Sequence, residues 1–166
     1  TRVYKNNKFE RPFSPKHALH ITMRTRVTAL RSRRILSWLS SFIPQKASYF
    51  GLRLYHFAIV NNHLHLLILA PNRRALNGFS RVITGVVARR VLRVEKGRRA
   101  GIKMWERRPY SRVISWGREF KNVLAYIERN VLEATRQIRY VARDKKLEGP
   151  LKQFIGDKLV PQLTLR

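Results

Sequence analysis

Two histidines separated by one leucine are the first feature of the sequence that could do chemistry. His63 and His65 alternate with Leu64 and Leu66. Residues two apart in a strand point to the same face, so both imidazoles would project together while the leucines turn to the other side. Two imidazoles so placed can hold one divalent metal ion. The same pattern is also typical of two ordinary surface histidines, so the pair alone does not decide between these interpretations.

A tyrosine and an amide form the second candidate group. Tyr126 and Asn130 are four residues apart in a segment with helical periodicity, and Asn122 precedes them by one turn. Their spacing predicts one shared helix face, beside the apolar stripe. A helical tyrosine is most commonly a half-buried anchor whose hydroxyl finds a partner. Spacing alone therefore gives Tyr126 no chemical role.

The chain contains no cysteine. This excludes disulfides, thiolate zinc sites and cysteine nucleophiles together. Any metal ion must therefore bind to histidine, asparagine, glutamine or carboxylate side chains.

The charge of the chain indicates a polyanionic partner. Lys and Arg number 36 against 9 Asp and Glu, which gives a net charge of +27. Because basic residues occur in every segment, neutralisation would spread over a wide surface, which favours a phosphate backbone over a small acidic ligand. We expect phosphate contacts from a set of arginines distributed along the chain, namely Arg24, Arg26, Arg73, Arg74, Arg81, Arg107, Arg108 and Arg129.

The same basic residues argue against a membrane partner. They interrupt every apolar segment, and none of these segments reaches the ~20 residues needed to span a bilayer. We therefore expect a cytoplasmic protein that associates with the nucleoid or with ribosomes.

The apolar periodicity predicts four strands and three helices. Strands are expected at 17–26, 52–60, 63–69 and within 104–114, with Asn61-Asn62 as a tight hairpin turn that tolerates left-handed backbone angles. Helices are expected at 35–43, 76–91 and 120–134, the first ended by Pro44 and the second by Gly97. This order predicts an α+β, ferredoxin-like (RRM-like) split βαβ sandwich. Its antiparallel sheet would carry the histidine pair, and an added C-terminal helix would carry the tyrosine.

The sequence also predicts one domain with two basic tails. An N-terminal arm covers 1–16, the domain covers 17–140, and a tail broken by glycines and prolines covers 141–166.

Three motifs in order resemble the single-tyrosine HUH transposases, which include the IS200-like and REP-associated tyrosine transposases. Residues 55–68, Tyr-His-Phe-Ala-Ile-Val-Asn-Asn-His-Leu-His-Leu-Leu-Ile, resemble the histidine signature. Trp-Glu-Arg-Arg at 105–108 and Leu-Ala-Tyr-Ile-Glu-Arg-Asn at 124–130 resemble the tryptophan-containing strand and the tyrosine helix of that family. The resemblance covers roughly 17–134, and three motifs are more specific than one. Two family prolines are replaced, by Asn61 and Val131.

The resemblance implies a function and a role for four residues. His63 and His65 would bind Mg²⁺ or Mn²⁺, Asn130 would complete the metal site, and Tyr126 would be the nucleophile. The chain would then be a metal-dependent endonuclease and strand transferase that cleaves and rejoins single-stranded hairpin DNA through a 5′-phosphotyrosine. Relatives that act as dimers and relatives that act as monomers leave a homodimer open.

The spread of charge supports a second hypothesis from another class. A transposase-like domain recruited as a structural rRNA-binding protein of the ribosome, with its catalytic groups as relics, would carry such charge and such tails.

Overall fold

The computed structural model describes residues 12–98 and 101–139. In chain order the elements are β1 (Ala18–Arg24), α1 (Arg33–Tyr49), β2 (Arg53–Ile59), β3 (His63–Leu69), α2 (Arg73–Leu92), β4 (Tyr110–Ile114) and α3 (Arg118–Ala134). This is the predicted order of four strands and three helices. Most of the predicted arm and all of the predicted tail lie outside the described residues.

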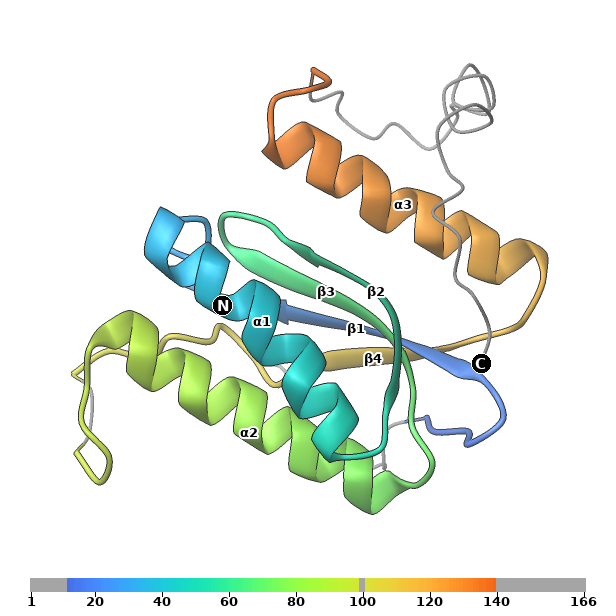
Figure 1. The fold of residues 1–166 in the computed structure, drawn as a ribbon, viewed down its shortest axis with the longest axis horizontal. Coiled ribbons are helices and arrows are strands. Elements are labelled where there is room, and N and C mark those ends of the chain that lie inside the picture. The colour runs from blue at the N-terminus through green and yellow to red at the C-terminus, as the bar shows by residue number, and fades with distance from the viewer. Residues whose placement is uncertain (1–11, 99–100, 140–166) are drawn as a thin grey trace, which may run out of the picture.

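One antiparallel sheet organises the domain. Its strand order is β2-β3-β1-β4, so β1 and β3 lie in the centre. The strands of the first half, β1-α1-β2, alternate in the sheet with those of the second half, β3-α2-β4. The predicted ferredoxin-like split βαβ arrangement is confirmed, including the added helix α3 (Figure 1).

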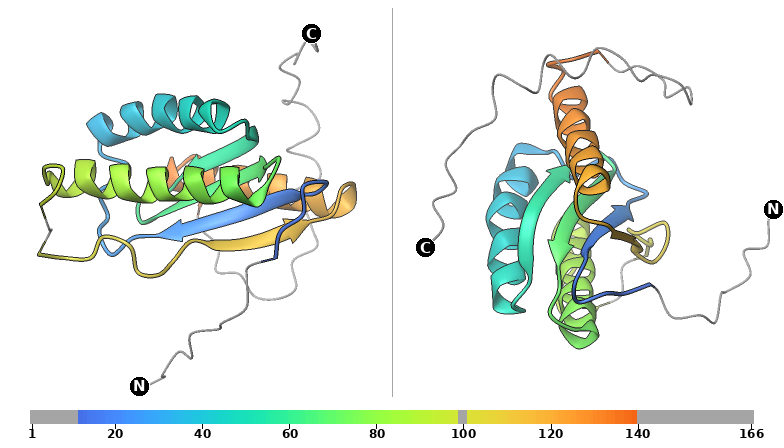
Figure 2. Two further views of the ribbon diagram at one scale, coloured as in Figure 1. Left: turned by 90° about the horizontal axis from the view of Figure 1, so that it is seen from below. Right: turned by 90° about the vertical axis from the view of Figure 1, so that its right-hand side faces the viewer.

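Alternate residues of the central strands serve two different cores. Ile21 of β1 and Leu66 of β3 belong to the larger cluster, which they share with buried residues of α1 and α2. Leu67 of β3 faces the other way and packs with Val123 and Ile127 of α3. The sheet is therefore covered by α1 and α2 on one face and by α3 on the other (Figure 2).

The prediction that Pro44 ends the first helix is wrong. Helix α1 continues through Pro44 to Tyr49. Its buried stripe keeps a four-residue spacing beyond the proline, from Ile43 to Ala47. Proline inside a helix costs about 3 kcal/mol or more, so burial of this stripe against the core outweighs the local penalty.

Helix α2 ends within one residue of the predicted 91, but Gly97 is not the residue that ends it. Its last residue is Leu92, and Arg93 follows in the left-handed conformation with φ 55°. The Arg93 N–H donates to the carbonyl of Arg89 and closes the last turn. Gly97 has φ 89° but lies in the following loop, so it does not cap the helix.

The hairpin between β2 and β3 is confirmed, with a different turn. The Val60 N–H donates to the His63 carbonyl over 2.8 Å. Neither Asn61 nor Asn62 has a positive φ. Instead the Asn62 carbonyl accepts a hydrogen bond of 2.7 Å from the N–H of Thr25, just after β1. The turn is thus fixed by its contact with the neighbouring strand.

Of the predicted strand within 104–114, only Tyr110–Ile114 is β4. Upstream of it, Trp105 forms a single bridge with Thr25, and its ring Nε1–H donates to the Thr84 carbonyl over 2.8 Å. Within 12–98 and 101–139, no helix is both long and apolar enough to cross a membrane.

Candidate active site

The two histidines lie on the face of β3 that α3 covers. His65 is 2% exposed, and its neighbour His63 is half-buried. Their ring centroids are 4.8 Å apart and their planes are nearly perpendicular, at 84°. Both imidazoles therefore project from the same face of β3, as the spacing predicted. Burial of His65 also argues against an ordinary surface histidine at that position.

Helix α3 brings Tyr126 to the same place. Buried Val123 and Ile127 hold the helix on the sheet, and Tyr126 borders this stripe. The Tyr126 ring lies edge to face on the ring of His65, with 5.6 Å between centroids and 89° between planes. Two residues far apart in sequence are thus adjacent within a single chain.

Asn130 lies one turn beyond Tyr126 on the same helix and is 5% exposed. Helix α3 runs back over the sheet toward the end at which β3 begins (Figure 1). Four helical residues advance about 6 Å, so Asn130 lies nearer than Tyr126 to the end of the sheet that carries His63. A buried amide on this side of the helix is consistent with the predicted metal set.

The amide of Asn62 orients the ring of His63. Asn62 Oδ1 lies 2.7 Å from His63 Nδ1. An amide oxygen can only accept, so His63 Nδ1 carries the proton and donates it. The lone pair of this ring is therefore on Nε2. Metal-binding histidines usually have their other nitrogen held in this way.

Sequence reasoning missed two residues of β1 that contact His65. His65 Nδ1 lies 3.2 Å from His20 Nε2 and 3.3 Å from Thr22 Oγ1. The His20 ring is stacked on His65 at 5.4 Å and meets the edge of Tyr126 at 6.1 Å. Burial, followed by the charge of Arg112, lowers the pKa of His20 from 6.5 to about 4.

A fourth histidine on this face was also missed. His56 of β2 pairs in register with Leu67, next to the Ala58–His65 pair. Its Nε2 is buried without a hydrogen-bond partner in the described part of the chain. Burial lowers the pKa of His56, and the carboxylate of Glu128 on α3 opposes this shift. In the sequence, His20 and Thr22 are two residues apart, as are His56 and Ala58, so each pair shares one face of its strand. Only the strand register shows that these residues flank His65.

Four of the predicted arginines gather at the end of the sheet that carries His63. Arg24 is the register partner of His63, and its Nε is 3.3 Å from Glu106 Oε1. The Arg26 N–H donates to the Met104 carbonyl over 2.7 Å, which ties the loop before β4 to the end of β1. The same loop carries Arg107 and Arg108, which are exposed, as are Arg24 and Arg26. We call Arg24, Arg26, Arg107 and Arg108 the basic end.

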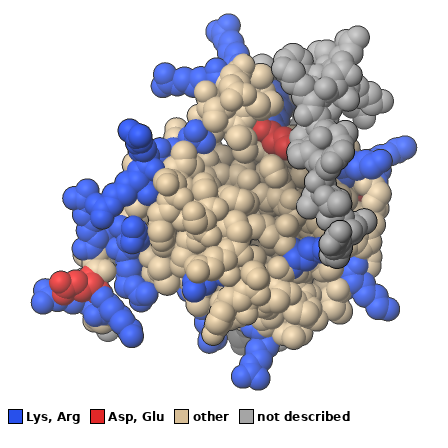
Figure 3. Space-filling model, viewed as in Figure 1, with Lys and Arg blue, Asp and Glu red and all other residues tan. Residues whose placement is uncertain are grey.

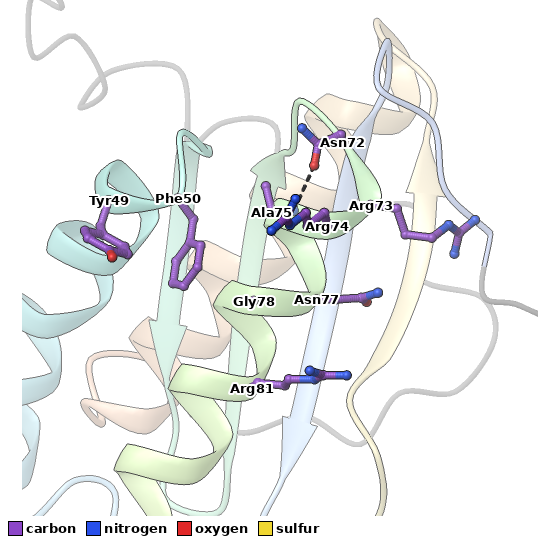
Figure 4. A pocket seen from close by; sticks show the side chains of 9 residues that line it. All are labelled: Tyr49, Phe50, Asn72, Arg73, Arg74, Ala75, Asn77, Gly78 and Arg81. Carbon is purple, nitrogen blue, oxygen red and sulfur yellow. Dashed lines mark hydrogen bonds between the residues drawn. The ribbon is translucent and has the colours of Figure 1, made fainter.

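The remaining predicted arginines are elsewhere. Arg73, Arg74 and Arg81 are on α2, on the opposite face of the sheet, and line a hollow of about 760 Å³ (Figure 4). The other residues that line it are Tyr49, Phe50, Asn72, Ala75, Asn77 and Gly78. Arg129 is on α3, and its Nε donates to Glu133 Oε1 over 2.8 Å. The structure thus divides the predicted phosphate contacts among three places.

Basic side chains project from the rim of the face shown in Figure 3, whose centre is formed by other residues. In Figure 3 they are most crowded on the left, where α1 begins and α2 ends in the matching view of Figure 1. Exposed arginines at these helix ends are Arg33, Arg34, Arg89, Arg90 and Arg93. Because α1 starts shortly after β1 ends, this group lies toward the same end of the molecule as the basic end.

Comparison with known proteins agrees with this architecture. Residues 14–130 match the family described as "Transposase IS200 like", and this range includes His63, His65, Tyr126 and Asn130. The chain therefore belongs to the IS200-like transposase family. No protein with a curated description matches significantly.

Two solved structures are similar to the domain. A REP-associated tyrosine transposase, bound to a REP hairpin, is 12% identical with a TM-score of 0.53; the match covers 78% of this chain and 73% of that one. A candidate transposase from Deinococcus radiodurans R1 is 21% identical with a TM-score of 0.49, over 74% of this chain and 97% of that one. The first of these supports the fold.

Proposed function

We propose that this protein is a metal-dependent nuclease and strand transferase that acts on single-stranded DNA with Tyr126 as its nucleophile. The observation that carries the proposal is the edge-to-face contact of Tyr126 with His65, at 5.6 Å between ring centroids. A phenol next to a buried imidazole of a histidine pair is the arrangement that the family chemistry requires. Family membership over 14–130 supports the same function.

The reaction is a displacement at phosphorus. Tyr126 Oη forms a bond to the scissile phosphate while the bond from phosphorus to the 3′ oxygen breaks. The phenol loses its proton, and the departing 3′ oxygen takes up a proton to become a hydroxyl. The 5′-phosphotyrosine keeps the energy of the broken bond, so attack by a 3′-hydroxyl of another strand rejoins the DNA and releases Tyr126.

The residues present fit a divalent metal ion. His63 Nε2 carries a lone pair because Nδ1 donates to Asn62, and the rings of His63 and His65 are 4.8 Å apart. Within the described residues no group of three or more His, Cys, Asp or Glu could hold a metal ion, so a third ligand from this part of the chain would have to be of another residue type. The buried amide of Asn130 supplies an oxygen, which Mg²⁺ or Mn²⁺ accepts. A bound metal ion would neutralise charge that builds on the phosphate.

One chain is proposed to form a complete site. His20, His65 and Tyr126 contact one another without help from another subunit. This supports a catalytic unit that acts in cis, and a homodimer would bring two such units together rather than complete one.

Hairpin DNA is the proposed substrate. The similar REP-associated transposase was solved with a REP hairpin, and Arg24 of the basic end is exposed and is the register partner of His63. Guanidinium groups at this position would hold the phosphates on either side of the scissile bond.

A labelled single-stranded hairpin incubated with the protein and Mg²⁺ tests the proposal. We expect a protein–DNA adduct that survives denaturation and is absent in Tyr126→Phe. Tyr110→Phe is the matched control, since Tyr110 is 64% exposed on β4 and should leave the adduct unchanged. An adduct that persists in Tyr126→Phe would overturn the assignment of the nucleophile.

The total charge favours a second candidate function. A net charge of +27 exceeds what one cleavage site needs, and exposed arginines also occupy the helical layer. A non-catalytic rRNA-binding protein on the ribosome would use such a surface. Co-sedimentation with ribosomes at high salt, with no adduct on any hairpin, is the result that would favour this candidate.

A further inference from the structure

Strand β1 presents two polar side chains to the candidate metal-binding strand. Thr22 is the direct register partner of His65, and His20 lies two residues earlier on the same face. Both side chains reach the same atom, His65 Nδ1, at 3.3 Å from Thr22 Oγ1 and 3.2 Å from His20 Nε2. The same row of the sheet continues to Ala58 on β2, which offers no polar side chain, and to Tyr110 on β4, the register partner of Thr22, which is 64% exposed.

The contacts with β1 determine which ring nitrogen of His65 would bind a ligand. Nδ1 points to β1, where it is occupied, so a ligand can be bound only through Nε2. An imidazole that binds a metal ion through Nε2 must carry its proton on Nδ1. Thr22 Oγ1 and a neutral His20 Nε2 are both able to accept that proton.

We propose that His20 and Thr22 are positioning residues that hold His65 with its proton on Nδ1, so that Nε2 is the ligand atom. This rests on the proposed function of His65 as a metal ligand. Asn62 does the same for His63 through a bond of 2.7 Å. The two histidines would thus be oriented from different elements, His63 from the hairpin turn and His65 from the neighbouring strand.

The stack of His20 on His65 adds a steric constraint. The two rings are 5.4 Å apart at 24°, while Tyr126 meets both of them edge on. Rotation of the His65 ring would therefore collide with His20 on one side and with Tyr126 on another. Replacing His20 by a smaller residue should loosen the ring even if Thr22 still accepts its proton.

Nitrogen-15 NMR of the histidine rings tests this inference in the metal-free full chain. We expect the wild-type His65 ring to be neutral with its proton on Nδ1. His20→Leu and Thr22→Val, made together, should convert a measurable fraction of His65 to the form protonated on Nε2. His17→Gln is the control, because His17 bonds to Ser14 before β1 and should leave the His65 signals unchanged.

A wild-type His65 with its proton on Nε2 would overturn the inference, and so would an unchanged form in the double variant. The NMR result does not depend on cleavage, so it is separate from a failure of the proposed function.

Mn²⁺ binding, measured by electron paramagnetic resonance, gives a second readout. We expect the affinity for Mn²⁺ to fall by about 10- to 100-fold in the double variant. His20→Gln, combined with Thr22→Val, should restore most of this affinity, because the glutamine amide oxygen can accept the same hydrogen bond.

Discussion

His65 on the central strand β3 and Tyr126 on the last described helix meet edge to face, with their ring planes at 89°. The contact depends on two patterns that were independent in the sequence. The period of two in β3 turns His65 toward α3, and the helical stripe that contains Ile127 places Tyr126 over it. The proposed chemistry follows from this contact.

Asn130→Ala should weaken metal binding without unfolding the protein. Asn130 is the buried amide that we assign as third ligand. Its loss should lower the affinity for Mn²⁺, measured by electron paramagnetic resonance, by tenfold or more. Asn122→Ala provides a control on the same helix, since Asn122 is exposed two turns earlier. Equal affinities for wild type and Asn130→Ala would remove Asn130 from the site.

Acid should destabilise the metal-free fold in part through His20. Its pKa is lowered from 6.5 to about 4 by burial and by Arg112. The unfolded chain therefore binds a proton near pH 6.5, whereas the folded chain does so only near pH 4. The free energy of unfolding should fall as the pH drops across this window.

His20→Asn removes this proton-binding difference. Denaturant titrations at several pH values should give a shallower pH dependence for the variant than for wild type between about pH 6.5 and 4. Some dependence should remain, because burial also lowers the pKa of His56. Identical slopes in both proteins would show that His20 is not buried as the structure places it.

Arginines of the basic end should contact the strand that is cleaved. Arg107→Ala with Arg108→Ala should weaken binding of a short single strand and reduce the salt slope of log Kd by about 0.7 for each lost phosphate contact. Arg73→Ala with Arg74→Ala is the matched pair, since these arginines line the hollow on the opposite layer. A larger loss in the second pair would mean that the strand follows the helical layer instead.

Pro44→Ala should stabilise the protein. Helix α1 continues through this residue, so an alanine restores a backbone N–H for the Ser40 carbonyl. We expect a gain of about 1–3 kcal/mol in the free energy of unfolding from denaturant titration. Pro71→Ala, in the loop before α2, should give no gain. A loss of stability in Pro44→Ala would show that the proline is required by its surroundings.

Much of the fold could be predicted from local pattern. Alternation located β3 at its observed bounds, and the helical stripe of α3 put Tyr126 and Asn130 on one side. The predictions that failed concerned features that depend on contacts between residues distant in sequence. Pro44 signals a helix end, yet packing of Ile43 and Ala47 against the core carries α1 past it.

The missed part of the site has a similar cause. His20 and Thr22 have no special spacing relative to His65, and their roles appear only once β1 and β3 are paired in register. The arginines could be counted from the sequence, but their division between the basic end and the α2 hollow depends on which layer each element joins.

The most direct test of the account is to identify the residue that becomes attached to DNA. Hairpin DNA with a labelled scissile phosphate is incubated with the full chain and Mn²⁺, the DNA is digested, and the protein is mapped by mass spectrometry. We expect a phosphate-linked nucleotide on Tyr126 and, in the same reaction, a free 3′-hydroxyl on the released strand. Label on another residue, or cleavage that leaves no covalent attachment to the protein, would contradict the central claim.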